Sequence, residues 1–576
     1  MSLYANLGEV AGLGREQNQT VSGKREGTDP RQRPLQRHVF ESVIARTLQL
    51  PRGHHDYRVT QTFVPMRDGV ELATDVYEPE DGTMGTILIR TPYSRDGLIA
   101  HLTAGFFASP GYLVVNQSCR GTFGSGGDFA PFSQEVEDGA DTVAWLRRQP
   151  WFGGRFALWG ASYLGFTAWA TMMDPPPELV AAVIAASTHD NHQAAHGAGA
   201  FSLEETVGLL DAFGHLGAGT LENILLGVSS GRRLAPAYDE LPLVRARETV
   251  FADSTMPYVE WLTAPDADDP VWRTMRLDQA LERIDVPVLL QGGWQERFLD
   301  QMIAQYSRLR ARGVDVGLTI GPWTHIEIAT KAAGLLMTET LDWLAEHLAE
   351  TGLRERSSPV RIYVTAADEW RSLPQWPPLR NDRVLYLRPD GELGDAQPAP
   401  DAGPTTFTFD PGDPTPSVGG RIIHPTRGGY RDNRKLEKRA DVLTFTTPPL
   451  REALGVIGTP VVEMAHHTDN PHADLFVRLC EVGRRGKSVN VSDGFRRLGP
   501  EDANGTIRLR LDPVAHRFEP GVRIRLQVSG GAHPRYARNL GTGLDPATSS
   551  DLAVSNREVF HGAGGFSQVF LPCGVS

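Results

Sequence analysis

The chain has 576 residues and a formal net charge of −13, with 40% hydrophobic and 22% charged residues. The length exceeds one ordinary hydrophobic core and predicts several domains, and the average composition excludes both wholesale disorder and a membrane protein. The acidic balance, without clustered Lys and Arg, argues against a nucleic-acid partner, and the absence of an apolar run of about 18 residues predicts no spanning helix and no membrane partner.

Residues 1–55 are expected to form an N-terminal extension. The first forty residues are polar and charged where a signal peptide needs an apolar segment, so a cytoplasmic location is expected. Three widely separated cysteines, Cys119, Cys480 and Cys573, show no C-x-x-C spacing. We therefore expect buried thiols and no zinc or redox pair.

Residues 56–188 alternate strands and helices, which predicts the first part of a doubly wound α/β domain. Its β-branched runs include "TILIRTPY", "YLVVNQSCRG" and "LVAAVIAAST". Residues 189–278 have helical periodicity and no β-branched runs, so they are expected to form a helical cap. The α/β pattern resumes over 279–355 with "IDVPVLLQGGW" and "VDVGLTIGPW". Such a cap usually covers a site at the carboxyl ends of the strands.

Residues 356–576 change character. Many short strands, among them "RVLYLRPDG", "DVLTFTTPPL" and "VRIRLQVSGG", are separated by Pro, Gly, Asp and Asn. This spacing is typical of an antiparallel sandwich, and we predict a jelly-roll-like all-β domain. The fold class is therefore an α/β domain with an inserted helical cap and a C-terminal all-β domain.

The segment "ALWGASYLGFTAW", residues 157–169, carries a candidate nucleophile. An apolar strand runs into Gly160, Ser162 and Gly165 and then into a helix. This arrangement comes close to the G-x-S-x-G nucleophile elbow, but Leu164 occupies the place of the second glycine. A serine needs a base and oxyanion donors to act as a nucleophile, so the remaining members have to be found elsewhere in the chain.

A histidine and a carboxylate stand where this chemistry requires them. His325 directly follows an apolar strand and a turn in "VGLTIGPWTH". Glu296 lies two residues beyond Trp294, at the end of the preceding strand, and Asp300 is the reserve candidate for the acid. The order serine, acid, histidine is that of the α/β-hydrolases.

Two tyrosines are candidate oxyanion donors. Elbow geometry assigns one donor to the backbone N–H of Tyr163. Tyr93 ends the strand "LIRTPY", where its hydroxyl could supply the second donor or its ring could simply pack.

Several motifs together resemble one family. They are "TPY", "QSCRGTFGSGGDF", "WFGGRFALWGASYLGFTAW", "GGWQERF", "IGPWTH", "DEWRSLPQWP" and "PRYARNLGTG". From about residue 56 to the end, the chain resembles the cocaine esterase and X-prolyl dipeptidyl-peptidase-like (CocE/NonD) serine hydrolases of the α/β-hydrolase superfamily. The resemblance implies an α/β-hydrolase domain, a helical cap and a C-terminal jelly roll.

The same resemblance implies roles for individual residues. It makes Ser162 the nucleophile within a G-x-S-Y-x-G motif, His325 the base, and Tyr93 and Tyr163 the oxyanion donors. The family acid is an aspartate, whereas this sequence has Glu296. One additional methylene can be absorbed by a shift of the loop.

The substrate is expected to be a small acyl ester. Relatives that act on α-amino acid esters have a carboxylate cluster beside the acid, whereas this sequence has Phe298 and Leu299. An apolar acyl pocket is expected instead, with Phe298, Trp151 and Phe166 as candidate walls. Peptidase or amide acylase activity, as in an X-prolyl dipeptidyl-peptidase, is the alternative, and a non-catalytic carbohydrate-binding protein is a remote one.

No cofactor or metal is expected. The histidines in "HDNH" lack the spacing of a helical metal site, and those in "HHTDNPHADLF" flank a turn. The oligomeric state cannot be read from the sequence, and a homo-oligomer is left open.

Overall fold

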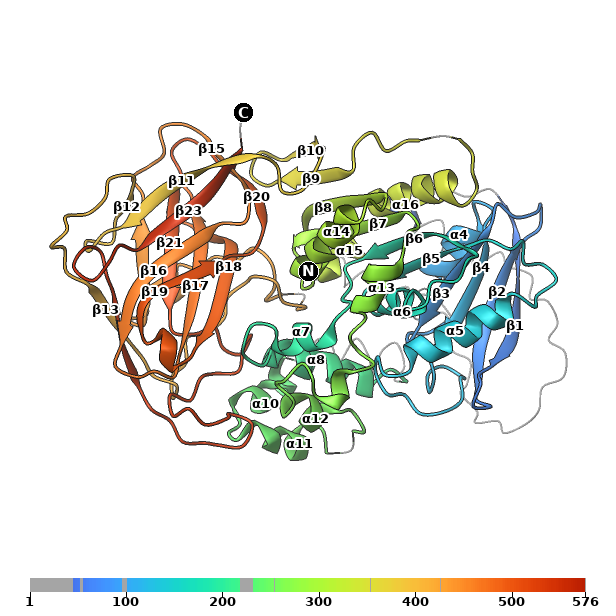
Figure 1. Cartoon of the computed structure of the whole chain (residues 1–576), viewed down its shortest axis with the longest axis horizontal. Coiled ribbons are helices and arrows are strands. Elements are labelled where there is room, and N and C mark those ends of the chain that lie inside the picture. The colour runs from blue at the N-terminus through green and yellow to red at the C-terminus, as the bar shows by residue number, and fades with distance from the viewer. Residues whose placement is uncertain are drawn as a thin grey trace.

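The computed structural model describes residues 45–51, 55–95, 101–217, 231–252, 254–352, 354–424 and 426–574. The expected extension, residues 1–55, therefore lies mostly outside the described residues. A mixed sheet flanked by helices forms one part of the molecule, short helices form a second part beside it, and an all-β part completes the structure (Figure 1). No helix in the described ranges is long and apolar enough to cross a membrane.

The first sheet has ten strands in the order β1-β2-β4-β3-β5-β6-β7-β8-β9-β10. Strands β3 to β9 pair in parallel, while β1, β2 and β10 join antiparallel at the two ends. The strands are β1 Tyr57–Pro65, β2 Glu71–Pro79, β3 Thr86–Thr91, β4 Leu113–Ser118, β5 Phe156–Ala161, β6 Leu179–Ala185, β7 Val288–Gln295, β8 Val316–Thr324, β9 Val360–Val364 and β10 Glu369–Leu373.

Helices cover both faces of this sheet. Because side chains alternate along a strand, Leu88 of β3 packs into one core and its neighbours Ile87 and Ile89 pack into another. The first core includes residues of α5, α6 and α14, and the second includes residues of α4 and α16. These helices are α4 Phe106–Ala108, α5 Glu135–Leu146, α6 Tyr163–Thr171, α14 Leu299–Ala311 and α16 Ala333–His347, with a short π-helix, η2 His101–Gly105, before α4 and α15 His325–Ile328 after β8.

The described residues between β6 and β7 form mostly short helices, of which α7, α8, α10, α11 and α12 lie together in the lower part of Figure 1, while α13 lies higher, nearer the sheet. Their apolar residues, such as Leu203, Trp261 and Trp272, join the first core of the sheet. The helices are α7 Asn191–His196, α8 Leu203–Gly214, α10 Ala235–Asp239, η3 Leu243–Arg245, α11 Ala246–Thr249, α12 Tyr258–Leu262, η4 Pro270–Trp272 and α13 Asp278–Arg283.

The C-terminal part consists of a nine-stranded sheet and a four-stranded sheet around one apolar core. The smaller sheet has the order β14-β21-β17-β18. The strands are β11 Arg380–Leu387, β12 Leu393–Gly394, β13 Thr405–Phe409, β14 Val442–Thr446, β15 Leu454–Gly458, β16 Val461–Thr468, β17 Ala473–Val482, β18 Ser488–Leu498, β19 Asn504–Arg510, β20 Val514–Phe518, β21 Arg523–Ser529, β22 Ser555–Val559 and β23 Gln568–Gly574, with 3-10 turns η5 Leu436–Lys438 and η6 Pro500–Asp502.

The structure differs from the expected boundary near residue 356 in one respect. β9 pairs in parallel with β8, and β10 pairs with β9, so the ten-stranded sheet continues to Leu373. The sequence pattern does not show that β9 and β10 belong to the first sheet. A short strand can pair with either sheet, because tertiary packing and not its own sequence decides which strand it joins.

Candidate active site

Ser162 lies in a strained turn between β5 and α6. Its backbone has φ 57° and ψ −122°, a conformation that a residue with a side chain rarely adopts. A Cβ on Gly160 would lie 2.1 Å from the carbonyl oxygen of Leu164, so only glycine permits this close return of the chain. The turn places the serine at the carboxyl end of β5, where a nucleophile elbow presents its hydroxyl.

The late glycine of the motif also has a packing reason. A Cβ on Gly165 would lie 2.5 Å from the Cβ of Ser187, which follows β6. Gly165 therefore lets α6 approach the neighbouring strand end. Both glycines of "GASYLG" thus have a steric role in this turn. The departure from G-x-S-x-G therefore reflects the packing of α6 on β6 and does not indicate a lost motif.

Three side chains from three strand ends form one hydrogen-bonded line. The His325 Nε2 atom lies 3.0 Å from the Ser162 Oγ atom, and the His325 Nδ1 atom lies 2.8 Å from a carboxylate oxygen of Glu296. The Glu296 side chain is fully buried, and its other oxygen accepts the backbone N–H of Phe298 at 2.7 Å. The carboxylate is therefore held from both sides and faces the imidazole.

Asp300, the reserve candidate for the acid, points elsewhere. It lies in the first turn of α14, and its carboxylate forms an ion pair with Arg421 of the C-terminal part at 2.9 Å. The structure thus brings Glu296 to His325 and places Asp300 against another domain.

Both candidate oxyanion donors lie beside the serine. Tyr163 is the first residue of α6, so its backbone N–H has no acceptor within the helix. Tyr93 follows β3, and its hydroxyl interacts with Ser162. Burial raises the pKa of Tyr93 to about 12, which outweighs the lowering by Ser162, so the hydroxyl is a neutral donor at physiological pH.

The three candidate pocket residues fall in different places. The ring of Phe298 stands edge-on to His325, with 5.6 Å between ring centroids. Phe166 is fully buried and packs on Phe132, with 4.9 Å between centroids. Trp151 precedes the amino end of β5 and packs on Trp145, so the length of β5 separates it from Ser162.

Phe298 is therefore the one candidate that the structure brings to the proposed site. Phe166 is a buried core residue of α6. Trp151 lies toward the amino ends of the parallel strands, whereas Ser162 lies at their carboxyl ends. Both corrections have the same cause: an aromatic residue near a strand packs wherever apolar surface is available, and sequence does not show at which end it does so.

Comparisons with known proteins identify the family. A family described as X-Pro dipeptidyl-peptidase (S15 family) matches residues 68–327, and the X-Pro dipeptidyl-peptidase C-terminal non-catalytic domain matches residues 351–566. The chain thus carries both domains of the S15 family, and it is a serine hydrolase. The predicted α/β-hydrolase class with a C-terminal all-β domain is thereby confirmed.

Individual relatives of this S15-family chain agree. It is 29% identical to cocaine esterase from Rhodococcus sp. (strain MB1 Bresler) over 573 residues, which cover 89% of this chain and 98% of the relative. An α-amino acid ester hydrolase structure superposes with a TM-score of 0.75 at 23% identity, covering 90% of this chain and 97% of the other. An aminopeptidase from a marine sediment Thaumarchaeota archaeon gives 0.73 at 23% identity, covering 91% and 97%. These two structures support the fold.

The S15-family chain also has a carboxylate near His325 that sequence reasoning missed. Glu205 on α8 accepts the backbone N–H of Ile423 at 2.7 Å. Burial raises its pKa, and the charge of Arg297, the N–H of Ile423 and the charge that His325 carries when protonated oppose this effect. Only the tertiary fold brings α8 to this place, so no local motif could have revealed the residue.

The C-terminal domain contacts the loop that carries Glu296. Arg421 lies between Asp300, at 2.9 Å, and Asp512, at 2.6 Å. The side chain of Gln295 donates to the carbonyl of Val491 at 3.3 Å. The end of β7 is thereby fixed from outside the hydrolase domain.

The residues of "HDNH" have structural partners. Asp190 caps α7 by accepting the backbone N–H of Gln193 at 2.9 Å, and His192 contacts the carbonyl of Pro265 at 2.9 Å. Within the described ranges no group of three or more His, Cys, Asp or Glu residues could hold a metal ion.

Proposed function

We propose that this serine hydrolase is a carboxylesterase, in which Ser162 is the nucleophile, His325 the general base and Glu296 the carboxylate that orients it. The observation that carries the proposal is the continuous line of 3.0 Å and 2.8 Å contacts joining the three side chains. Their order along the chain and the strained turn at Ser162 support the same assignment.

In the first half-reaction the Ser162 Oγ atom attacks the carbonyl carbon of the ester while His325 Nε2 takes its proton. The negative charge develops on the carbonyl oxygen, and the Tyr163 N–H and the Tyr93 hydroxyl stabilise it. The imidazolium then gives its proton to the leaving alkoxide, so the alcohol departs and an acyl-enzyme remains. Glu296 holds the tautomer and stabilises the imidazolium.

In the second half-reaction water attacks the acyl carbonyl. His325 takes a proton from the water, and the same two donors hold the second oxyanion. Collapse of the intermediate breaks the bond to the Ser162 Oγ atom, which recovers its proton from the imidazolium. The carboxylic acid is released and the enzyme returns to its starting state.

Two observations favour an ester over a peptide. The relative from Rhodococcus is named for ester cleavage, and the apolar ring of Phe298 stands beside His325. Glu205 is the observation that favours the peptidase alternative, because a carboxylate near the base could bind a substrate ammonium. In this structure, however, the carboxylate already accepts the N–H of Ile423 and lies next to the charge of Arg297.

The experiment compares p-nitrophenyl acyl esters with aminoacyl p-nitroanilides. The wild type is expected to hydrolyse the esters faster, and Ser162→Ala is expected to lower kcat by about 10⁴- to 10⁶-fold because the nucleophile is lost. Ser307→Ala is the matched control, since this serine is exposed on α14 and its hydroxyl donates to the carbonyl of Ile303.

Ester hydrolysis that survives Ser162→Ala contradicts the mechanism. Faster hydrolysis of the anilides than of the esters favours the peptidase alternative. A wild type that cleaves neither substrate favours the non-catalytic alternative.

A further inference from the structure

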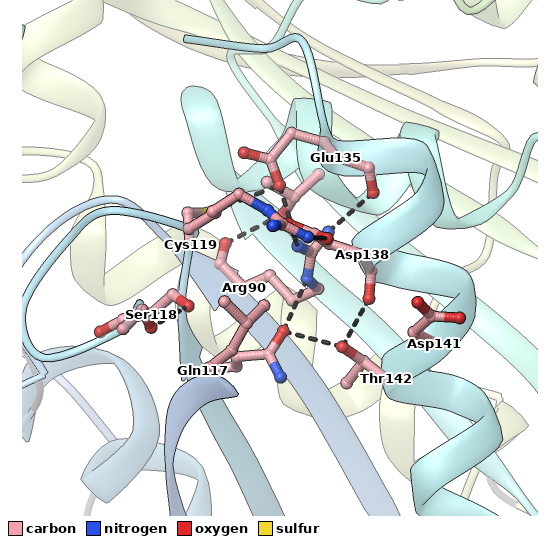
Figure 2. A network of polar contacts seen from close by, with 12 residues as sticks. Arg90, Gln117, Ser118, Cys119, Glu135, Asp138, Asp141 and Thr142 are labelled. Carbon is pink, nitrogen blue, oxygen red and sulfur yellow. Dashed lines mark hydrogen bonds and ion pairs between the residues drawn. The ribbon is translucent and has the colours of Figure 1, made fainter. Parts of the chain in front are cut away.

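Figure 2 shows a buried network of charged and polar side chains, which contacts the elbow helix α6 through Tyr163. Its members come from β3, from β4 and the two residues that follow it, and from α5, and all of them are less than one tenth exposed. They are Arg90, Gln117, Cys119, Arg120, Glu135, Asp138 and Thr142. The proposed chemistry uses none of these side chains, although keeping such charges away from water is costly.

Arg90 is the centre of the network. Its guanidinium donates to the side chain of Gln117 at 2.9 Å and to the backbone carbonyl of Glu135 at 2.8 Å. It also forms an ion pair with the Glu135 carboxylate at 3.0 Å. Asp138, 3.9 Å from Arg90, is held by Arg120 at 2.6 Å, so the two carboxylates each have a cation. A buried set of this kind is fixed in one arrangement, because moving one member leaves another uncompensated.

The carboxylate of Glu135 leads directly to the elbow. The Tyr163 hydroxyl donates to the other oxygen of Glu135 at 2.8 Å and accepts the backbone N–H of Phe132 at 2.8 Å. The ring of Tyr163 stacks on Phe132 with 4.3 Å between centroids and 22° between planes. Burial, followed by the charge of Glu135, raises the pKa of Tyr163 well above its ordinary range, so the hydroxyl keeps the proton that it donates.

The backbone of Arg90 also holds the strand that leads to the other donor. Arg90 belongs to β3, three residues before Tyr93. Its backbone carbonyl accepts the hydroxyl of Thr167, in the second turn of α6, at 2.9 Å. Arg90 therefore connects β3, which ends beside Tyr93, to α6, which begins at Tyr163.

We propose that Glu135, held by Arg90, is a positioning residue for the oxyanion hole: it anchors the side chain of Tyr163 so that the Tyr163 N–H and the Tyr93 hydroxyl converge on one point beside Ser162. The inference rests on the proposed function. Donors stabilise an oxyanion only if they are already aimed at the place where charge develops, and a displacement of about 1 Å can cost 10²-fold in rate. An anchor at the far end of the Tyr163 ring supplies this restraint.

The test is Tyr163→Phe, which removes the hydroxyl and keeps the ring that stacks on Phe132. We expect kcat for a p-nitrophenyl ester to fall by about 10- to 100-fold with KM within twofold, because the loss acts on the transition state. Phenylboronic acid forms a tetrahedral adduct on a nucleophilic serine and places an oxygen in the oxyanion hole. Its affinity is expected to fall by the same factor as kcat.

Thr340→Val is the matched control. Thr340 is fully buried on α16 and donates to the carbonyl of Leu336 at 2.8 Å, on the face of the sheet away from the network. This variant is expected to lower Tm and leave kcat and boronate affinity within twofold of the wild type. A purely structural role for Glu135 would give Tyr163→Phe the same behaviour.

Glu135→Gln repeats the test with a side chain of nearly the same shape, and kcat is taken per folded molecule for both variants. The inference is overturned if the folded variants lose Tm but keep the kcat and boronate affinity of the wild type. Failure of the proposed function looks different, because the wild type itself would then show no ester hydrolysis that depends on Ser162.

Discussion

At the scale of single residues, the proposed site depends on groups whose protonation is set by burial. Tyr93 is the clearest example, because burial raises the pKa of its hydroxyl to about 12. A phenol with such a pKa donates a hydrogen bond throughout the range in which an imidazole base works. Donation would be lost only as the pH rises through the folded pKa, since a phenolate has no proton to give.

Tyr93→Phe tests this donor. We expect kcat to fall by about 10²- to 10³-fold, the cost of losing one oxyanion-hole donor, with little change in KM. Between pH 8 and pH 10 the ratio of wild-type kcat to Tyr93→Phe kcat should stay constant, because Tyr93 keeps its proton in this range. A variant that keeps kcat within threefold would show that the ring only packs.

Glu296 shows how a residue-level departure from a family pattern is absorbed. The side chain is one methylene longer than the expected aspartate, yet one carboxylate oxygen reaches His325 while the other binds the N–H of Phe298 two residues away. The local turn thus folds the longer side chain back on its own loop.

At the scale of elements, the packing of α6 depends on Gly165, although glycine is an unfavourable residue in a helix. Glycine in a helix interior costs roughly 1 kcal/mol relative to alanine. Gly165 lies in the first turn of α6 and Gly208 in the interior of α8. Of the two, Gly165 meets another element, whereas nothing lies within 4 Å of a Cβ built on Gly208.

Gly165→Ala and Gly208→Ala form a matched pair. The first is expected to lower stability by about 1–3 kcal/mol through overpacking against Ser187 and to reduce kcat, because α6 carries the Tyr163 N–H. The second is expected to raise stability by up to about 1 kcal/mol and leave kcat unchanged. Thermal unfolding and ester turnover measure both effects, and the opposite signs of the two Tm shifts are the decisive observation.

The strand pattern explains why part of the site could be predicted. Ser162, Glu296 and His325 each follow an apolar run, and the carboxyl ends of parallel strands meet at one edge of a sheet. Glu205 and Arg421 escaped prediction because they approach from α8 and from the loop between β13 and β14, where no local pattern indicates what they face. Trp151 and Phe166 were placed by proximity in sequence, which does not show at which end a side chain packs.

At the scale of the whole molecule, the cap and the C-terminal domain meet through a contact between a buried carboxyl group and an arginine. Glu204 on α8 is 5% exposed and pairs with Arg427. Burial is the largest influence on this carboxyl group and raises its pKa from 4.5 to about 7, although the nearby Arg427 charge lowers it. The native state therefore holds a proton at a pH where the unfolded chain has released it.

This shift sets the sign of a pH effect on stability. Below pH 4.5 both states are protonated and Glu204 makes no difference, and as the pH rises from 4.5 to 7 the native state loses stability. The loss is on the order of 3 kcal/mol and is complete above the folded pKa. Glu204→Gln should therefore show a smaller decrease in Tm between pH 5 and pH 8 than the wild type.

Glu260→Gln, on the exposed face of α12, is the control for Glu204→Gln and should keep the wild-type pH dependence. If Tm falls by the same amount in Glu204→Gln and in the wild type between pH 5 and pH 8, the Glu204 carboxyl group is not the group that binds the proton.

β9 and β10, which extend the first sheet, determine where a fragment that contains the hydrolase domain could end. β8 ends at Thr324, next to His325, and pairs with β7 on one side and β9 on the other. A chain that stopped at residue 355 would turn β8 into an open edge, with unpaired backbone groups that invite another copy to add a strand. The ten-stranded sheet therefore extends to Leu373, and a fragment that ended earlier would leave β8, the strand that leads to His325, with an exposed edge prone to aggregation.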